Sequence, residues 1–154
     1  MKRSSSLLIT GMIGMLLLSG CGGKQSAMSS HDHGLDSERY ETTSSVTVMP
    51  ELLSVYTDNT QASYKAVGEL EDILKELKCY CGCMDDDQKL HDSLHRCFIA
   101  EKNDDGVKWT DHGAQCGTCL SELQDAKRLN DEGKSVDEIR DFIDNKYKGT
   151  APQV

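Results

Sequence analysis

The chain has 154 residues, which is enough for one small domain together with an anchor and a linker. Its 26 acidic residues outnumber its 17 basic residues, and the formal net charge is −9. A surface this acidic argues against binding of nucleic acid and against electrostatic adhesion to anionic lipid. Six of the seven cysteines lie between Cys79 and Cys119, so we expect any chemistry to be located there.

The first twenty residues have the parts of a secretory signal. A short basic start is followed by an apolar stretch at residues 7–18, which is too short to be a comfortable membrane span. The stretch ends in Leu-Ser-Gly before Cys21, which looks like a bacterial lipobox. That likeness implies cleavage before Cys21 and attachment of a lipid to its sulfur. We therefore expect a lipoprotein on the extracytoplasmic face of a bacterial membrane, the alternative being an uncleaved signal anchor.

The polar stretch at residues 21–45 contains Gly, Ser, His, Asp and Glu and almost no apolar side chain. This composition predicts a lipidated, flexible and disordered tether. Residues 46–148 are then expected to form a cysteine-rich helical domain, followed by a short tail at 149–154. At its start, residues 46–56 are predicted to form one or two short helical turns that pack onto the domain.

An amphipathic helix is predicted from about residue 59 to residue 77. Its apolar side chains recur at three- and four-residue intervals, while lysines and acidic residues occupy the other face. The apolar members are Tyr64, Val67, Leu70, Ile73, Leu74 and Leu77. Because the helix leads directly into the first cysteines, it should hold them at a rigid edge of the core.

Three thiols follow within five residues, at Cys79, Cys81 and Cys83. Side chains alternate with period two in an extended backbone, so all three sulfurs could point to one side. Gly82 would let the chain bend around whatever the sulfurs hold. Converging thiols suit a soft metal ion, whereas neighbours this close do not readily form disulfides with one another.

A second helix is predicted from about residue 88 to residue 100. Within it, His91 and Cys97 lie close enough along one face to converge on one point with Leu94. His112 then precedes a CxxC pair formed by Cys116 and Cys119 at the start of a third helix. A helix N-terminus stabilises a thiolate, so this pair suits either metal binding or dithiol exchange.

The remainder is predicted to be scaffold. An apolar face at Leu120, Leu123, Ala126 and Leu129 indicates that the CxxC helix continues to Gly133. Ser135 and Glu138 then form a capping box that opens a last amphipathic helix. Since no strand was evident, the predicted fold class is all-α, a bundle of about four helices with the cysteine-rich loop at one end.

Three separated segments also resemble the bacterial PCYCGC-motif lipoprotein family. They read KCYCGC at residues 78–83, HDSLHRCF at 91–98 and HGAQCGTCL at 112–120. Lys78 stands where the family motif has its proline, which changes the entry to the loop but keeps the sulfurs. The family is functionally uncharacterised, so the resemblance names relatives and gives no mechanism.

Three functions remain open from the residues alone. The first is a metal-binding module for zinc, copper or an iron–sulfur centre, and the second is a disulfide-stapled interaction domain without metal. The third is a thiol oxidoreductase at the CxxC, which the residues favour less than the other two because the sequence lacks a thioredoxin-like context. The candidate metal ligands are Cys79, Cys81, Cys83, His91, Cys97, His112, Cys116 and Cys119.

Overall fold

The computed structural model describes residues 38–82 and 93–150 of the chain. These residues form five α-helices, two short 3-10 helices and a three-stranded antiparallel sheet. The all-α prediction is therefore wrong, and the fold is a mixed one of helices and strands. In the part of the chain that is described, no helix is both long enough and apolar enough to cross a membrane.

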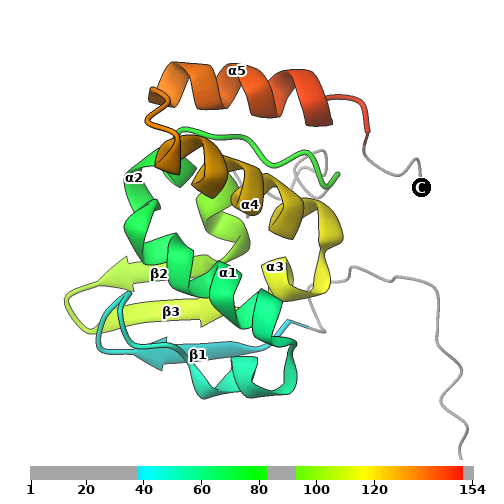
Figure 1. The fold of residues 1–154 in the computed structure, drawn as a ribbon. Helices are drawn as coiled ribbons and strands as arrows, with labels where there is room; N and C mark the ends of the chain where they lie inside the picture. The colour runs from blue at the N-terminus through cyan, green and yellow to red at the C-terminus, as the bar shows by residue number, and fades with distance from the viewer. Residues whose placement is uncertain (1–37, 83–92, 151–154) are drawn as a thin grey trace, which may run out of the picture. The chain divides into compact units, whose positions relative to one another are not determined.

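The sheet has the order β1-β3-β2, with β3 (Gly106–Thr110) in the middle. Strand β1 (Tyr40–Thr43) lies within the stretch predicted to be a tether, and it pairs with β3 across a large sequence separation. Strand β2 (Ile99–Asn103) forms a hairpin with β3. Figure 1 shows the three strands side by side, with the α-helices on one side of them.

The predicted second helix is also wrong over its described part. Leu94–Cys97 is a single 3-10 turn, η3, and the chain then enters strand β2. The strand turns at Asp104 and Asp105, where the Asp105 amide donates to the Asn103 side chain. Gly106 follows with φ of +135°, and a Cβ there would lie 2.2 Å from the Thr43 carbonyl oxygen. Only glycine fits a position this close to the neighbouring strand.

The predicted first helix is present as two helices. The 3-10 turn η2 (Glu51–Val55) leads into α1 (Asp58–Glu69), which Thr57 caps by accepting from the Thr60 amide. A break at Leu70, with φ of −106°, separates α1 from the short helix α2 (Glu71–Lys75). The change of direction brings the end of α2 to the cysteine segment.

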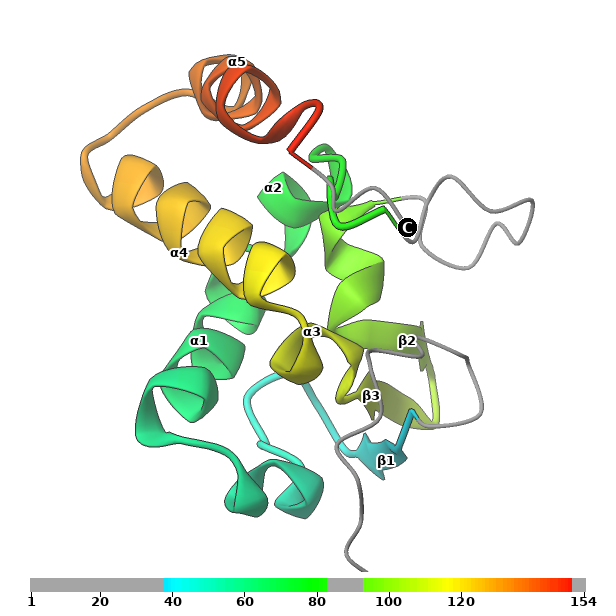
Figure 2. The ribbon, with the colours of Figure 1, turned by 90° about the vertical axis from the view of Figure 1, so that its right-hand side faces the viewer.

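The C-terminal helices follow the prediction. After the single turn α3 (His112–Gln115), α4 runs from Gly117 to Asp131 and α5 from Val136 to Tyr147. The predicted capping box is confirmed, with the Ser135 side chain accepting from the Glu138 amide and the Glu138 side chain from the Ser135 amide. Helix α4 packs against both α1 and α5, as Figure 2 shows from a second direction.

Aromatic side chains join the sheet to the helices. Trp109 of β3 is fully buried, and its indole N–H donates to Thr43 Oγ1 over 2.8 Å. Tyr64 of α1 lies edge-to-face with Phe98, with ring centroids 5.1 Å apart. The Tyr64 hydroxyl donates to the Thr110 carbonyl oxygen and accepts from the Ala114 amide. These contacts fix the sheet, α1 and α3 in one core.

Candidate metal centre

Four cysteine sulfurs converge at the end of the domain where α2, η3 and α4 meet. The Sγ atoms of Cys79, Cys81, Cys97 and Cys119 all lie within 4.8 Å of one another. Cys79 and Cys81 come from the segment after α2, Cys97 ends η3, and Cys119 lies in the first turn of α4. Three separate segments therefore supply the four thiols.

Backbone hydrogen bonds bring these segments together. The Leu94 amide donates to the Leu77 carbonyl oxygen over 2.8 Å, which joins the start of η3 to the end of the first helical region. Leu77 and Leu94 are also buried in the core next to the cysteines. On the other side, the Tyr80 amide donates to Glu122 Oε1 of α4 over 2.7 Å. The cysteine segment is thus held between η3 and α4.

The sulfurs are buried and carry no disulfide among the described residues. Cys97 and Cys119 are 0% exposed and Cys79 is 3% exposed, whereas Cys81 is only partly buried. The sulfurs of Cys79 and Cys119 are 3.3 Å apart, well beyond the roughly 2 Å of a disulfide bond. No disulfide joins any two of the five described cysteines. The arrangement is therefore a compact thiol cluster opening toward Cys81.

Electrostatics disfavour free thiolates at this site when no cation is present. The pKa of Cys119 lies well above its usual value because of hydrogen bonds to the sulfurs of Cys116, Cys79, Cys81 and Cys97, and burial raises it further. Taking several sulfurs to their anionic form in one dry place requires a compensating positive charge. The cluster is built for neutral thiols or for thiolates around a cation.

The CxxC pair does not resemble a redox site in its electrostatics. Cys116 is the N-cap residue of α4, and Cys119 lies three residues further along. The hydrogen bond with Cys119 lowers the pKa of Cys116, but hydrogen bonding to Cys81 and burial raise it more, so the net direction is upward. A nucleophilic cysteine needs a lowered pKa and access to solvent. Neither Cys116 nor Cys119 combines these properties.

His112 lies at the edge of the cluster beside Cys81. Its Nδ1 is 2.7 Å from Glu38 Oε1, and both side chains are 6% exposed. Burial lowers the pKa of His112, while hydrogen bonding with Cys81 and the charge of Glu38 raise it, and the net shift is upward. The carboxylate therefore fixes the orientation of an imidazole that faces the partly exposed thiol.

Residues 9–153 match a known family, described as a protein of unknown function with PCYCGC motif. The chain belongs to this family. The match covers most of the chain and confirms the predicted resemblance. No curated protein and no solved structure matches the chain.

The PCYCGC motif itself is only partly within the described residues. Cys79 and Cys81 of the motif join the four-thiol cluster with Cys97 and Cys119. Of the other predicted ligands, Cys116 and His112 lie next to the cluster but outside the group of four. Three predicted positions lie outside the described residues, namely Cys21, Cys83 and His91.

Two carboxylates beside the site, Glu38 and Glu122, were not predicted from the sequence of this PCYCGC protein. Glu38 contacts His112 from 74 residues away, and no local pattern predicts that contact. Glu122 is fully buried on α4, and it lies one turn after Cys119 on the same face of the helix. The sequence signal that could have identified Glu122 is the presence of a carboxylate on the apolar face of an amphipathic helix.

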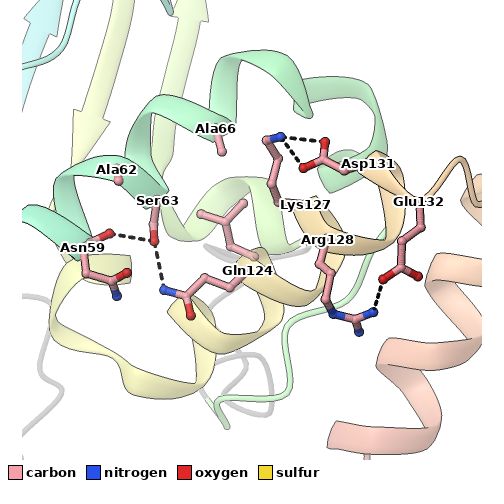
Figure 3. A pocket seen from close by; sticks show the side chains of 10 residues that line it. Asn59, Ala62, Ser63, Ala66, Gln124, Lys127, Arg128, Asp131 and Glu132 are labelled. Atoms are coloured by element: carbon pink, nitrogen blue, oxygen red, sulfur yellow. Dashed lines mark hydrogen bonds and ion pairs between the residues drawn. The ribbon is translucent and has the colours of Figure 1, made fainter.

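A groove between α1 and α4 is one concave feature of the described region (Figure 3). It has a volume of about 510 Å³, and polar side chains cross it. Gln124 donates to Ser63 Oγ over 3.1 Å, and Arg128 pairs with Glu132 over 2.8 Å. Among the described residues that line it there is no cysteine or histidine. The groove therefore offers none of the chemistry found at the thiol cluster.

Proposed function

We propose that this protein binds one soft metal ion through Cys79, Cys81, Cys97 and Cys119. The observation that carries the proposal is the convergence of the four sulfurs within 4.8 Å of one another. Tetrahedral zinc, with Zn–S bonds of about 2.3 Å, sets its sulfurs roughly 3.8 Å apart. The four thiols need only small side-chain movements to reach that spacing around a common centre.

Zinc is the ion that the donor set fits best. Four cysteines from separated segments form the usual closed structural site, in which all four positions are filled by protein. A doubly charged cation would also compensate the thiolates that the buried site otherwise disfavours. His112, oriented by Glu38 over 2.7 Å, would support the loaded site by donating its other ring nitrogen to the Cys81 thiolate. Copper(I) and an iron–sulfur centre also take thiolate ligands and are outcomes of the test.

We further propose that the domain is displayed outside the cytoplasm by a lipid on Cys21. The lipobox-like ending of residues 18–21 supports this anchor. Outside the cytoplasm, thiols tend to oxidise, and a bound metal would protect the cluster. Intact mass of the protein extracted from membranes should give a chain that begins at Cys21 and carries a lipid, and an unmodified chain that keeps residues 1–20 would contradict the anchor.

Intact mass of the domain under native and denaturing conditions tests the metal site. We expect a native mass excess of one metal ion, which disappears on denaturation and leaves the cysteines alkylatable. Cys97→Ser should abolish or strongly weaken this binding. The matched control is Cys116→Ser, since Cys116 lies beside the four sulfurs without belonging to the group.

Two results would contradict the proposed site, and a third would change only the identity of the metal. A mass deficit of paired hydrogens with no alkylatable thiol would indicate a disulfide-stapled domain instead. Equal loss of metal in both variants would show that the ligand set is different. A mass excess that matches copper or an iron–sulfur cluster would keep the site but overturn the assignment to zinc.

A further inference from the structure

Glu122 is a buried carboxylate beside the four thiols, and it is not one of the proposed metal ligands. The residue is 0% exposed, and it follows Cys119 by three positions on α4, so both side chains lie on the same face of the helix. Its Oε1 accepts a hydrogen bond of 2.7 Å from the Tyr80 amide. Tyr80 lies between Cys79 and Cys81, the two thiols contributed by the segment after α2.

The other carboxylate oxygen indicates that this placement is costly. Glu122 Oε2 is buried and has no hydrogen-bond partner among the residues that the structure describes. Burial raises the pKa of Glu122 to about 7, although hydrogen bonding with Cys79 and with the Tyr80 amide lowers it. A leucine at this position would avoid the desolvation cost of a carboxylate. The carboxylate therefore contributes a hydrogen bond to Tyr80 at a position where an apolar side chain would be buried at lower cost.

The same contacts determine where two of the thiols lie. The segment from Lys78 to Gly82 has no helix or strand hydrogen bonds of its own. Its backbone is attached to α4 through the Tyr80 amide, while the Tyr80 hydroxyl donates to Asp144 of α5 over 2.7 Å. Both anchors belong to Tyr80, but only the Glu122 contact holds the backbone between the two cysteines, and it comes from the helix that carries Cys119.

We propose that Glu122 is a positioning residue that holds the Cys79–Cys81 segment against α4, so that these thiols meet Cys119 with the geometry needed by a metal. The inference rests on the metal-binding function proposed above. It predicts that metal affinity depends on a carbonyl-type acceptor at position 122 and not on the negative charge. Hydrogen-bonded groups behind metal ligands typically contribute 10- to 100-fold to metal affinity.

Three variants separate this role from general stability. Glu122→Asp keeps the charge but shortens the side chain, which moves the acceptor away from the Tyr80 amide. Glu122→Gln removes the charge but keeps an acceptor at the same reach. Leu123→Ala is the matched control, because Leu123 is the neighbouring fully buried residue of α4 and its truncation lowers stability without removing the Tyr80 contact.

The measurements are zinc affinity by competition with a chromophoric chelator and the absorption spectrum of the cobalt(II)-substituted protein. Glu122→Asp should bind zinc about 10-fold or more weakly and change the thiolate-to-cobalt absorption. Glu122→Gln should keep both the zinc affinity and the cobalt spectrum close to those of the wild type. Leu123→Ala should unfold more easily while keeping the wild-type spectrum. The positioning role would be overturned if Glu122→Asp had the affinity and spectrum of the wild type. It would also be overturned if Glu122→Gln lost affinity as Glu122→Asp is expected to.

Amide hydrogen exchange in the metal-free protein tests the same role independently of metal binding. The Tyr80 amide should exchange faster in Glu122→Asp than in the wild type or in Glu122→Gln. Unchanged exchange would overturn the positioning role even if the protein binds zinc. If the wild type binds no metal but Tyr80 exchange responds as expected, then the proposed function fails while the role of Glu122 in holding the segment stands.

Discussion

At the scale of single residues, Asp111 is the best-supported polar group in the described core. Its side chain is 0% exposed and accepts three hydrogen bonds, from the backbone and Nε of Arg39 and from the Tyr56 hydroxyl, at 2.7–2.8 Å. These bonds attach the residues before β1 and after η2 to the end of β3. Asp111→Asn should therefore lower the free energy of unfolding by about 2 kcal/mol, measured by urea denaturation. The control, Asp131→Asn, removes an exposed pair with Lys127 and should cost less than about 1 kcal/mol.

The contribution of Asp111 should also depend on pH. Burial raises the pKa of this carboxyl, but the hydrogen bonds from Arg39 and Tyr56 lower it more, so it lies below its usual value of 3.8 in the folded protein. A lowered folded-state pKa gives stability that is present above the unfolded value and is lost as pH falls through the folded value. The stability difference between wild type and Asp111→Asn should thus be largest near neutral pH and shrink below about pH 4. A difference that grows on acidification would contradict the assignment.

Cysteine spacing predicted more of the site than any other sequence feature did. Cys79 and Cys81 could be assigned to one site because an extended segment places alternate side chains on one side. Cys97 and Cys119 were predicted as ligands because six cysteines lie close together in the sequence, although no local pattern distinguished Cys119 from Cys116. Tertiary contacts decided that choice, and they also brought Glu38 to His112 from the start of the described domain.

At the scale of elements, Gly113 in α3 controls how closely this turn approaches the thiol cluster. A Cβ at Gly113 would lie 2.4 Å from the Phe98 ring and 2.9 Å from the Cys97 carbonyl oxygen. Gly113→Ala should therefore displace Phe98 and Cys97 and cost about 2 kcal/mol of stability. Zinc affinity should fall as well, because Cys97 is a proposed ligand. Thermal unfolding and chelator competition measure the two effects.

Gly117 provides the matched control for that substitution. It lies at the first position of α4, and a Cβ there would meet no atom within 4 Å. Gly117→Ala should be neutral or slightly stabilising, because alanine loses less backbone entropy than glycine. A similar loss of stability in both variants would show that close approach at Gly113 is not the cause.

The all-α prediction failed because helical spacing and 3-10 spacing are similar over a few residues. Leu94 and Cys97 recur at an interval of three, which fits the single turn η3 as well as a longer helix. The missed hairpin had its own signal in the Asp-Asp-Gly turn and in the alternation of buried Val107, exposed Lys108 and buried Trp109. Strand β1 carried no comparable signal, because its pairing with β3 depends on distant residues.

At the scale of the whole domain, the proposed metal joins parts of the chain that are far apart in sequence. Its ligands come from the segment after α2, from η3 and from α4, and these elements also contact the sheet and α1. A ligand that binds only the folded state stabilises it by an amount that grows with the free ligand concentration. Metal should therefore stabilise the entire domain and not only the residues around the cluster.

Thermal unfolding with and without zinc tests this linkage. Zinc at 100 times its dissociation constant should raise the free energy of unfolding by about 2.7 kcal/mol, and a strong chelator should reverse the rise. The shift should disappear in Cys119→Ser, which removes a buried member of the cluster, and persist in Cys116→Ser. Zinc-independent unfolding of the wild type would contradict a metal centre in the core. A zinc-dependent shift that survives in Cys119→Ser would instead place the ion at other ligands.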